Sequence, residues 1–358
     1  MTMKKIKALK QIFLESENID GFLVFDCANL IWLTGFSGAS AMFLPKKGKD
    51  IVYVYSVNYS QAESKLTGVK VELVNRGENT MTKIAKQAST FELKKLGVDA
   101  LSVENWRVLS KYLGGEKMLE LDNSYIRELR KVKDEEEVEL MKKAGDLTSK
   151  AMQTAQEVVA AGVKEYEVAA EMEYSMRKGG ASGIAFDTIV ASGPNSAFPH
   201  GGCSDREIRN GELVVVDVGA TCKFYHSDMS RTFVAGRASE KQKKLYQIVK
   251  SAQQIALESI KPGVEARDVD AAARKKIAES GFGEFFVHSL GHGVGLEVHE
   301  PPTLGSDSKE NLAVGNVVTV EPGIYIVGYG GIRIEDTVVL RKNAVEKLTN
   351  GPYIIGKE

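Results

Sequence analysis

Residues 212–234 read ELVVVDVGATCKFYHSDMSRTFV, a stretch that places two aspartates inside a strongly apolar β pattern. Asp217 closes the apolar run, where a buried carboxylate is costly unless a cation or hydrogen bonds compensate it. Asp228 opens the return run after a polar turn. A hairpin turning near residues 220–223 would bring the two side chains together. Because neighbouring carboxylates repel and a divalent ion removes that repulsion, the stretch predicts a β-rich metal site.

The same pattern occurs near the C-terminus. Glu321 ends an apolar strand in NVVTVEPGIYI (316–326), and Glu335 interrupts another in GGIRIEDTVVL (330–340). The glycine-rich residues 328–331 form the expected turn between them. A single acid in such a place is more often a strand end that is solvated or paired with a lysine. Four acids in two hairpins instead favour a shared cation site.

All five histidines lie after residue 199. Two of them, His292 and His299, occur in GHGVGLEVHEPP (291–302), which is too rich in glycine and proline for a helix. One histidine added to the four acids makes an oxygen-rich ligand set that suits two divalent ions such as manganese, cobalt, iron or zinc. Two ions about 3.5–4 Å apart can share a bridging hydroxide and polarise a carbonyl group.

The other three histidines differ in context. His200 lies in FPHGG, where proline and paired glycines expose the ring on a loop, and this favours a functional role. We expect His226 to be either a supporting or a surface residue. His288 is expected to pack or form a hydrogen bond at a strand edge.

Bulk composition excludes several classes of partner. The 358-residue chain has 47 basic and 48 acidic residues and a net charge of −1, so it lacks a general attraction for nucleic acid or anionic membranes. No apolar run approaches the roughly 20 residues that span a bilayer. Three cysteines without CxxC spacing argue against a disulfide scaffold. These features predict a cytoplasmic protein that acts on small molecules or peptides.

The chain length suits two domains. Residues 1–20 have the pattern of an amphipathic helix. Up to residue 125, helical patterns alternate with short apolar runs, which is typical of a small α/β domain without its own catalytic residues. These runs are GFLVF at 21, SAMFLP at 40, DIVYVY at 50, VKVELV at 69 and LGVD at 96.

The second domain is expected over residues 126–358. Helical patterns cover 126–160, 164–179 and 239–281, and the charged run KVKDEEE (131–137) looks like a helix start. Glycine-punctuated β segments lie between them, so this part of the chain predicts an α+β fold.

These motifs together resemble the five-ligand signature of the creatinase-like, "pita-bread" metallopeptidases. Within that group the sequence is most similar to Xaa-Pro dipeptidases (prolidases) and aminopeptidases P. The residues that carry the resemblance are Asp217, Asp228, His292, Glu321 and Glu335, in VVVDVGA, SDMSRTF, LGHGVGLEVHE, TVEPGIY and GIRIEDT. The resemblance implies a creatinase/prolidase-like N-terminal domain (1–125), a pita-bread catalytic domain (126–358) and a homodimer.

The resemblance also implies a role for each ligand. Asp217 would bind one metal ion, and His292 with Glu321 would bind the other. Asp228 and Glu335 would bridge both ions. Manganese or cobalt is the favoured metal, with iron and zinc as alternatives.

Four further residues match the family's motifs. His200 and His299 would hold the scissile carbonyl group, and Glu321 would be the general base. Arg333 would support the metal cluster. Many relatives carry an arginine at the position of Thr303, where it pairs with the substrate carboxylate. Because threonine cannot form that ion pair, the resemblance supports a preference for dipeptides less than it supports the other assignments.

The resemblance implies hydrolysis of the Xaa-Pro bond at the N-terminus of dipeptides or short peptides, with prolidase favoured over an aminopeptidase P that acts on longer peptides. Creatinase-type C–N hydrolysis without metal is disfavoured, because all five ligand positions are intact. A non-catalytic binding protein on the same fold is the other alternative. Such relatives typically lose ligands and gain charged tails, and the sequence shows neither.

Overall fold

The computed structural model divides the chain into two compact units, Met1–Arg130 and Lys131–Glu358. It describes residues 2–15, 19–91, 93, 95–115, 119–121 and 123–356. A boundary before residue 126 stays a prediction. The helix expected over residues 1–20 is present as α1 (Thr2–Glu15), while residues 1 and 16–18 lie outside the described part.

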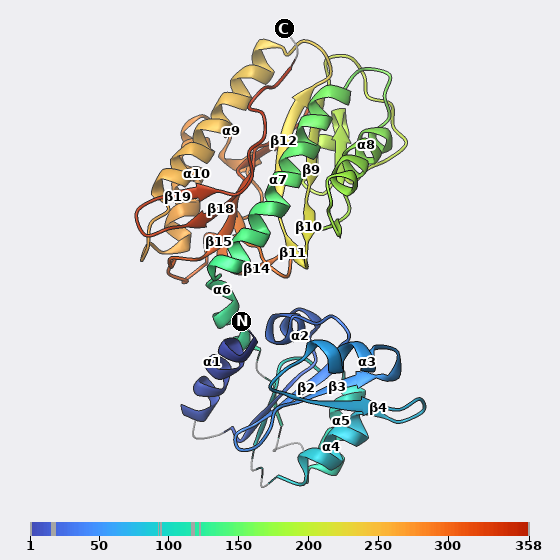
Figure 1. Cartoon of the computed structure of the whole chain (residues 1–358). Coiled ribbons are helices and arrows are strands. Elements are labelled where there is room, and N and C mark those ends of the chain that lie inside the picture. Colours follow the sequence, from blue (N-terminus) through green and yellow to red (C-terminus); the bar gives the residue numbers. More distant parts are fainter. Residues whose placement is uncertain are drawn as a thin grey trace. The chain divides into compact units, whose positions relative to one another are not determined.

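The first unit contains a six-stranded sheet in the order β4-β3-β2-β1-β5-β6 (Figure 1). Each of the five apolar runs forms a strand, as predicted. The sixth strand was not expected, because its three residues, LEL, form no continuous apolar run, unlike those of the equally short β5. The strands are β1 (Gly21–Val24), β2 (Ala39–Pro45), β3 (Ile51–Tyr55), β4 (Lys70–Val74), β5 (Leu96–Val98) and β6 (Leu119–Leu121). The remaining helices up to residue 131 are α2 (Cys27–Thr34), α3 (Ser56–Lys65), α4 (Thr80–Ala88), α5 (Val103–Tyr112) and α6 (Ser124–Lys131).

The described residues of the second unit, up to 356, form four long helices. Asp134 caps the first of them in a capping box with Glu137, which confirms the charged run as a helix start. The pattern over 239–281 is two helices rather than one, because Pro262 and Gly263, with a φ of 86°, interrupt it. The helices are α7 (Glu135–Val158), α8 (Glu165–Lys178), α9 (Glu240–Ser259) and α10 (Ala266–Glu279), with short 3₁₀ turns η2 (Gly193–Ala197) and η3 (Gly283–Phe285).

Strands of the second unit form small antiparallel sheets. Their orders are β12-β9-β8, β14-β13-β15-β18-β19, β11-β10-β7 and β16-β17. The strands are β7 (Gly183–Ile184), β8 (Ile189–Ser192), β9 (Leu213–Val218), β10 (Ala220–Cys222), β11 (Tyr225–His226), β12 (Met229–Val234), β13 (Gly291–Gly293), β14 (Glu300–Leu304), β15 (Val317–Val320), β16 (Gly323–Ile326), β17 (Gly330–Arg333), β18 (Asp336–Leu340) and β19 (Val345–Lys347).

Both predicted hairpins are present. In the first, β9 pairs with β12 so that Asp217 lies opposite Ser230, and the chain turns at Lys223 and Phe224, which both have positive φ. In the second, β15 pairs with β18, and Val320 lies opposite Asp336. The acids therefore emerge at neighbouring strand positions, as the sequence pattern predicted.

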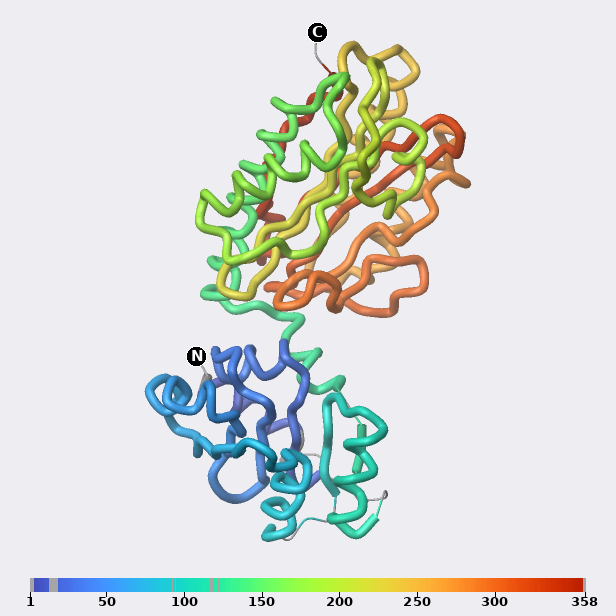
Figure 2. The backbone as a smooth tube through the Cα atoms, turned by 90° about the vertical axis from the view of Figure 1, so that its right-hand side faces the viewer, coloured from blue at the N-terminus to red at the C-terminus, as the bar shows by residue number. Residues whose placement is uncertain are grey.

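Two helix pairs bury different strands of this unit. Apolar residues of α7 and α8, which lie side by side in Figure 2, pack against β8, β9 and β12. Those of α9 and α10 pack against β15, β17 and β18. This mixture of helices and antiparallel strands confirms the predicted α+β class. The two cores hold the hairpins that carry the acids.

Candidate metal centre

One cavity in the second unit brings the predicted site residues together. Its volume is about 590 Å³. The nine predicted residues that line it are His200, Asp217, Asp228, His292, His299, Thr303, Glu321, Arg333 and Glu335. They come from strands, strand ends and loops that are far apart in the sequence, so the cavity is a product of the tertiary fold.

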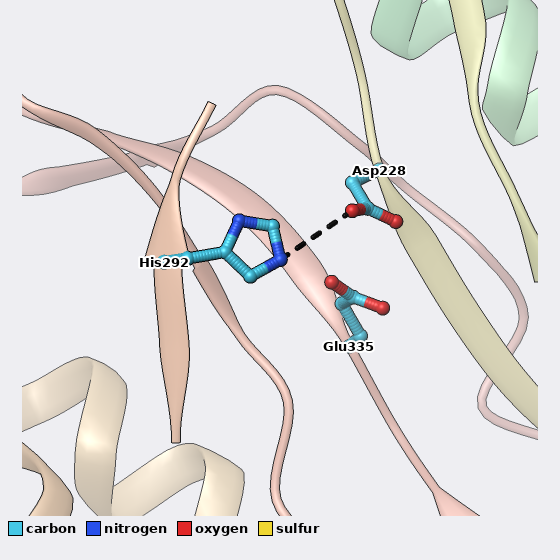
Figure 3. Close-up of side chains that lie close together, drawn as sticks. All are labelled: Asp228, His292 and Glu335. Atoms are coloured by element: carbon cyan, nitrogen blue, oxygen red, sulfur yellow. Dashed lines mark ion pairs between the residues drawn. The ribbon is translucent and has the colours of Figure 1, made fainter. Parts of the chain in front are cut away.

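The centre of the cavity is a group of three side chains that converge from separate strand segments (Figure 3). One ligand atom from each of Asp228, His292 and Glu335 lies within 4.8 Å of the other two. His292 Nε2 is 3.7 Å from Asp228 Oδ2 and 3.3 Å from Glu321 Oε1. Its Nδ1 lies 3.1 Å from the Gly293 carbonyl oxygen. If Nδ1 donates there, the lone pair of Nε2 points toward the acids, as a metal ligand requires.

Three carboxylate oxygens of the site have no hydrogen-bond partner within the part of the chain that the structure describes: Asp217 Oδ1, Asp228 Oδ1 and Glu335 Oε1. For two of these acids the protein binds the other oxygen. Asp217 Oδ2 accepts from Arg333 at 2.7 Å, and Glu335 Oε2 accepts from Ser230 at 2.6 Å. Buried polar atoms are normally paired, so three unpaired oxygens facing one cavity fit a site for divalent cations.

The electrostatics of the site also favour the binding of cations. Burial and then the neighbouring carboxylates raise the pKa of Asp228 and of Glu335 well above the ordinary values. Burial also raises the pKa of Glu321. Burial lowers the pKa of His292, which keeps the imidazole neutral. Without cations the cavity thus favours the protonated forms of these acids, and bound cations can take the place of those protons.

A buried guanidinium group links the two hairpins. Arg333 is 3% exposed; its Nη2 donates to Asp217 and its Nε donates to Ser230 Oγ at 2.7 Å. The Ser230 hydroxyl in turn donates a hydrogen bond to the Glu335 carboxylate. The Nη1 atom donates to the Tyr325 hydroxyl at 2.9 Å. The planar fork of arginine makes all of these contacts at once, so Arg333 fixes acids from both hairpins.

Two histidines outside the central group also face the cavity. The rings of His299 and His292 lie with centroids 4.2 Å apart and planes tilted by 54°. Burial and then the nearby imidazoles of His292 and His200 lower the pKa of His299, so the ring is neutral at physiological pH. His200 is exposed and follows Pro199, whose carbonyl accepts from Arg333 at 3.0 Å. Both rings are available to a ligand in the cavity.

Part of the cavity wall comes from residues to which the sequence patterns gave no functional role. His288, expected only at a strand edge, lines the cavity, and its Nε2 lies 3.0 Å from the Tyr325 hydroxyl. Its place four residues before His292 was the available signal. Phe186 and Asp187 also line the cavity. The FDTIV segment gave no sign of this, because it has the pattern of an ordinary strand.

Comparison with known proteins agrees with this geometry. The model described as "Creatinase/Prolidase N-terminal domain" matches residues 5–132, and the model of metallopeptidase family M24 matches residues 139–342. The chain belongs to metallopeptidase family M24. It is therefore an enzyme whose family uses divalent metal ions, and the predicted two-domain metallopeptidase architecture is confirmed.

Relatives of this M24 member match along nearly the whole chain. The Xaa-Pro dipeptidase of Pyrococcus horikoshii is 40% identical over 347 residues, which cover 97% of each chain. The structure of the Xaa-Pro dipeptidase from Bacillus anthracis matches with a TM-score of 0.94 and 35% identity over 100% of both chains. The structure of the X-Pro aminopeptidase from Thermotoga maritima matches with a TM-score of 0.89 and 36% identity over 98% of this chain and 99% of that one.

Among the described residues, none of the helices has the length and apolar character needed to cross a bilayer.

Proposed function

We propose that this M24 enzyme is an Xaa-Pro dipeptidase that binds two divalent ions through the five predicted ligands, Asp217, Asp228, His292, Glu321 and Glu335. The main support for this proposal is the three unpaired carboxylate oxygens. They belong to three of the five ligands, and each is buried without a hydrogen-bond partner among the described residues, as an oxygen that binds a cation would be. Asp217 would bind one ion, His292 and Glu321 the other, and Asp228 and Glu335 both. The oxygen-rich set favours manganese or cobalt, with iron and zinc as alternatives.

When bound, the ions supply a Lewis acid that polarises the scissile carbonyl and makes a water molecule acidic near neutral pH. The chain supplies the proton transfers and the orientation. Glu321 is the general base, the role that the family resemblance gives it, and its Oε1 lies 3.3 Å from His292 Nε2 within the ligand group. His299 and His200 donate hydrogen bonds to the carbonyl oxygen as charge develops on it.

The proposed substrate is a peptide with proline after its first residue. Proline's nitrogen carries no hydrogen and its ring fixes φ, so ordinary peptidase sites accept the bond poorly. The names of the relatives support this specificity, since two of the three described above are Xaa-Pro dipeptidases. The cavity of about 590 Å³ has room for such a ligand.

A second candidate is an aminopeptidase P that acts on longer peptides. Thr303 favours it, because this residue lines the cavity where an arginine would otherwise pair with a dipeptide's carboxylate. The similarity to an X-Pro aminopeptidase also supports it.

We further propose a cytoplasmic homodimer. Three free cysteines, Cys27, Cys203 and Cys222, are consistent with a reducing compartment, and the dimer is an expectation from the family resemblance. Sedimentation analysis would test the dimer directly.

The test of the function is reconstitution of the metal-depleted protein with manganese, cobalt, iron or zinc. Each preparation is given Ala-Pro beside Ala-Pro-Ala. Cleavage of the dipeptide alone supports the dipeptidase, and cleavage of the tripeptide supports the aminopeptidase. No cleavage of either substrate with any of the four metals would exclude the proposed specificity.

A further inference from the structure

Strand β14 forms one edge of the cavity, and its residues alternate in burial. Three residues of the strand are buried: Glu300, Pro302 and Leu304. Thr303, and His299 just before the strand, are exposed and line the cavity. In a strand, a shift of one residue exchanges the two faces. The register of β14 therefore decides whether His299 and Thr303 reach a substrate.

A buried ion pair holds this strand at the end that carries His299. Lys133 Nζ lies 2.7 Å from Glu300 Oε1, and the two side chains are only 2% and 3% exposed. The backbone around Lys133 is fixed as well, because its N–H donates to the Gly315 carbonyl at 2.9 Å. Lys133, whose backbone is held by this hydrogen bond, thus binds Glu300, the residue directly after His299.

The loop before Glu300 also packs against the Glu300 carboxylate. A Cβ on Gly295 would collide with the Glu300 side chain, so the loop backbone lies directly against it. The Glu297 N–H donates to Glu300 Oε2 at 3.4 Å. On its other side the loop accepts a hydrogen bond at the Gly295 carbonyl from the N–H of His226, at 2.8 Å. The Glu300 carboxylate therefore contacts the preceding loop at Gly295 and at Glu297.

We propose that Lys133 is a positioning residue for His299, and that its ion pair with Glu300 holds the loop and the β14 register in which His299 faces the substrate. This inference rests on the proposed function, because it assigns Lys133 a part in the same reaction. Stability alone does not account for the pair, since a buried ion pair often contributes no more to stability than apolar side chains of the same volume.

The experiment compares Lys133→Met, Lys133→Arg and the neutral pair Lys133→Met/Glu300→Met in the manganese-loaded protein. Lys142→Met is the matched control, because Lys142, on helix α7, also forms an ion pair, with Glu346 at 3.2 Å, but both side chains of that pair are solvent-accessible. We expect Lys133→Met to lower kcat on the order of 10²-fold, as for a misplaced catalytic group, without changing the metal content. Lys133→Arg should restore most of kcat, and Lys142→Met should leave it unchanged.

Two readouts separate positioning from a general structural role. In a His299→Ala background, Lys133→Met should cause no further loss of kcat, because the residue it positions is gone. The neutral pair should recover thermal stability but not kcat, since two methionines fill the volume without fixing the loop. Hydrogen exchange of residues 294–304 should be faster in Lys133→Met than in the control.

An equal loss of kcat in both backgrounds, or a folded Lys133→Met protein with normal kcat, would overturn the inference. If the wild-type protein cleaves neither Ala-Pro nor Ala-Pro-Ala, the proposed function fails, and hydrogen exchange of residues 294–304 then decides the positioning role by itself. Unchanged exchange there would overturn it.

Discussion

Replacing Asp228 by asparagine should stabilise the metal-free protein while removing its response to metal. In the absence of cations, Asp228 is buried beside Glu335 and other acids, and its pKa is raised by burial and by those charges. Asparagine has nearly the same shape and carries no charge. The substitution therefore removes repulsion from the metal-free state and a ligand from the metal-bound state.

The magnitude follows from the geometry. Ligand atoms of Asp228 and Glu335 lie within 4.8 Å of each other, and two unit charges at that separation repel by about 3.5 kcal/mol at an effective dielectric constant of about 20. Protonating at pH 7 an acid whose ordinary pKa is about 3.9 costs about 4 kcal/mol. Because Asp228 can take up a proton instead of staying charged, this cost is the upper limit of the gain in unfolding free energy. We expect Asp228→Asn to raise the free energy of unfolding by about 3 kcal/mol, or the Tm by about 6–12 °C.

Calorimetric scans with and without manganese would measure both effects. Wild-type protein should gain about 2.7 kcal/mol for each bound ion at a metal concentration 100-fold above Kd, and Asp228→Asn should gain far less. The pH dependence has a defined sign. Because the folded-state pKa of Asp228 is raised, this residue costs the metal-free wild-type protein least stability below about pH 4, and the cost grows as the pH rises toward the folded-state pKa. The advantage of the variant should therefore vanish near pH 4.

Asp336→Asn is the matched control. Asp336 is also buried, and burial alone would raise its pKa, but Arg231 and Lys347 outweigh burial and lower it. Neutralising it should destabilise the protein at pH 7, the opposite of the effect at Asp228. A metal-free Asp228→Asn protein that is less stable than wild type at pH 7, or one that keeps the full metal response, would refute the reasoning.

Three further substitutions test the remaining roles. His299→Ala should lower kcat on the order of 10²-fold while the metal content by mass spectrometry stays at the wild-type value; an unchanged kcat would remove its role. Arg333→Lys should weaken metal binding about 10- to 100-fold in a chelator competition, because an ammonium group cannot reproduce the contacts to Asp217 and Ser230, and unaltered affinity would contradict this. Thr303→Arg should raise kcat/KM for Ala-Pro relative to Ala-Pro-Ala by about 10-fold through a charged hydrogen bond, and a constant ratio would argue against carboxylate contact there.

Much of the fold could be predicted from local patterns. Five strands of the first unit and both hairpins of the second appear in the sequence as alternating or continuous apolar runs bounded by turns, and paired hairpin residues lie close in the sequence, at most 22 residues apart (Val317 and Val339). Asp217 and Asp228 could be paired for the same reason. The division between α9 and α10 was missed, although Pro262 and Gly263 mark it in the sequence. Strand β6 was also missed, because a glutamate interrupts its two leucines and leaves no apolar run.

Sequence by itself thus determined which residues could bind metal and which acids pair within a hairpin. Only the tertiary structure decided that the two hairpins and His292 meet in one cavity, where Arg333 reaches Asp217 across 116 residues of sequence and Lys133 reaches Glu300 across 167. The physical reason is that strand pairing is a local property of the chain. The unpaired carboxylate oxygens and the buried ion pair arise instead from two helix-covered cores packing together, which no local pattern encodes.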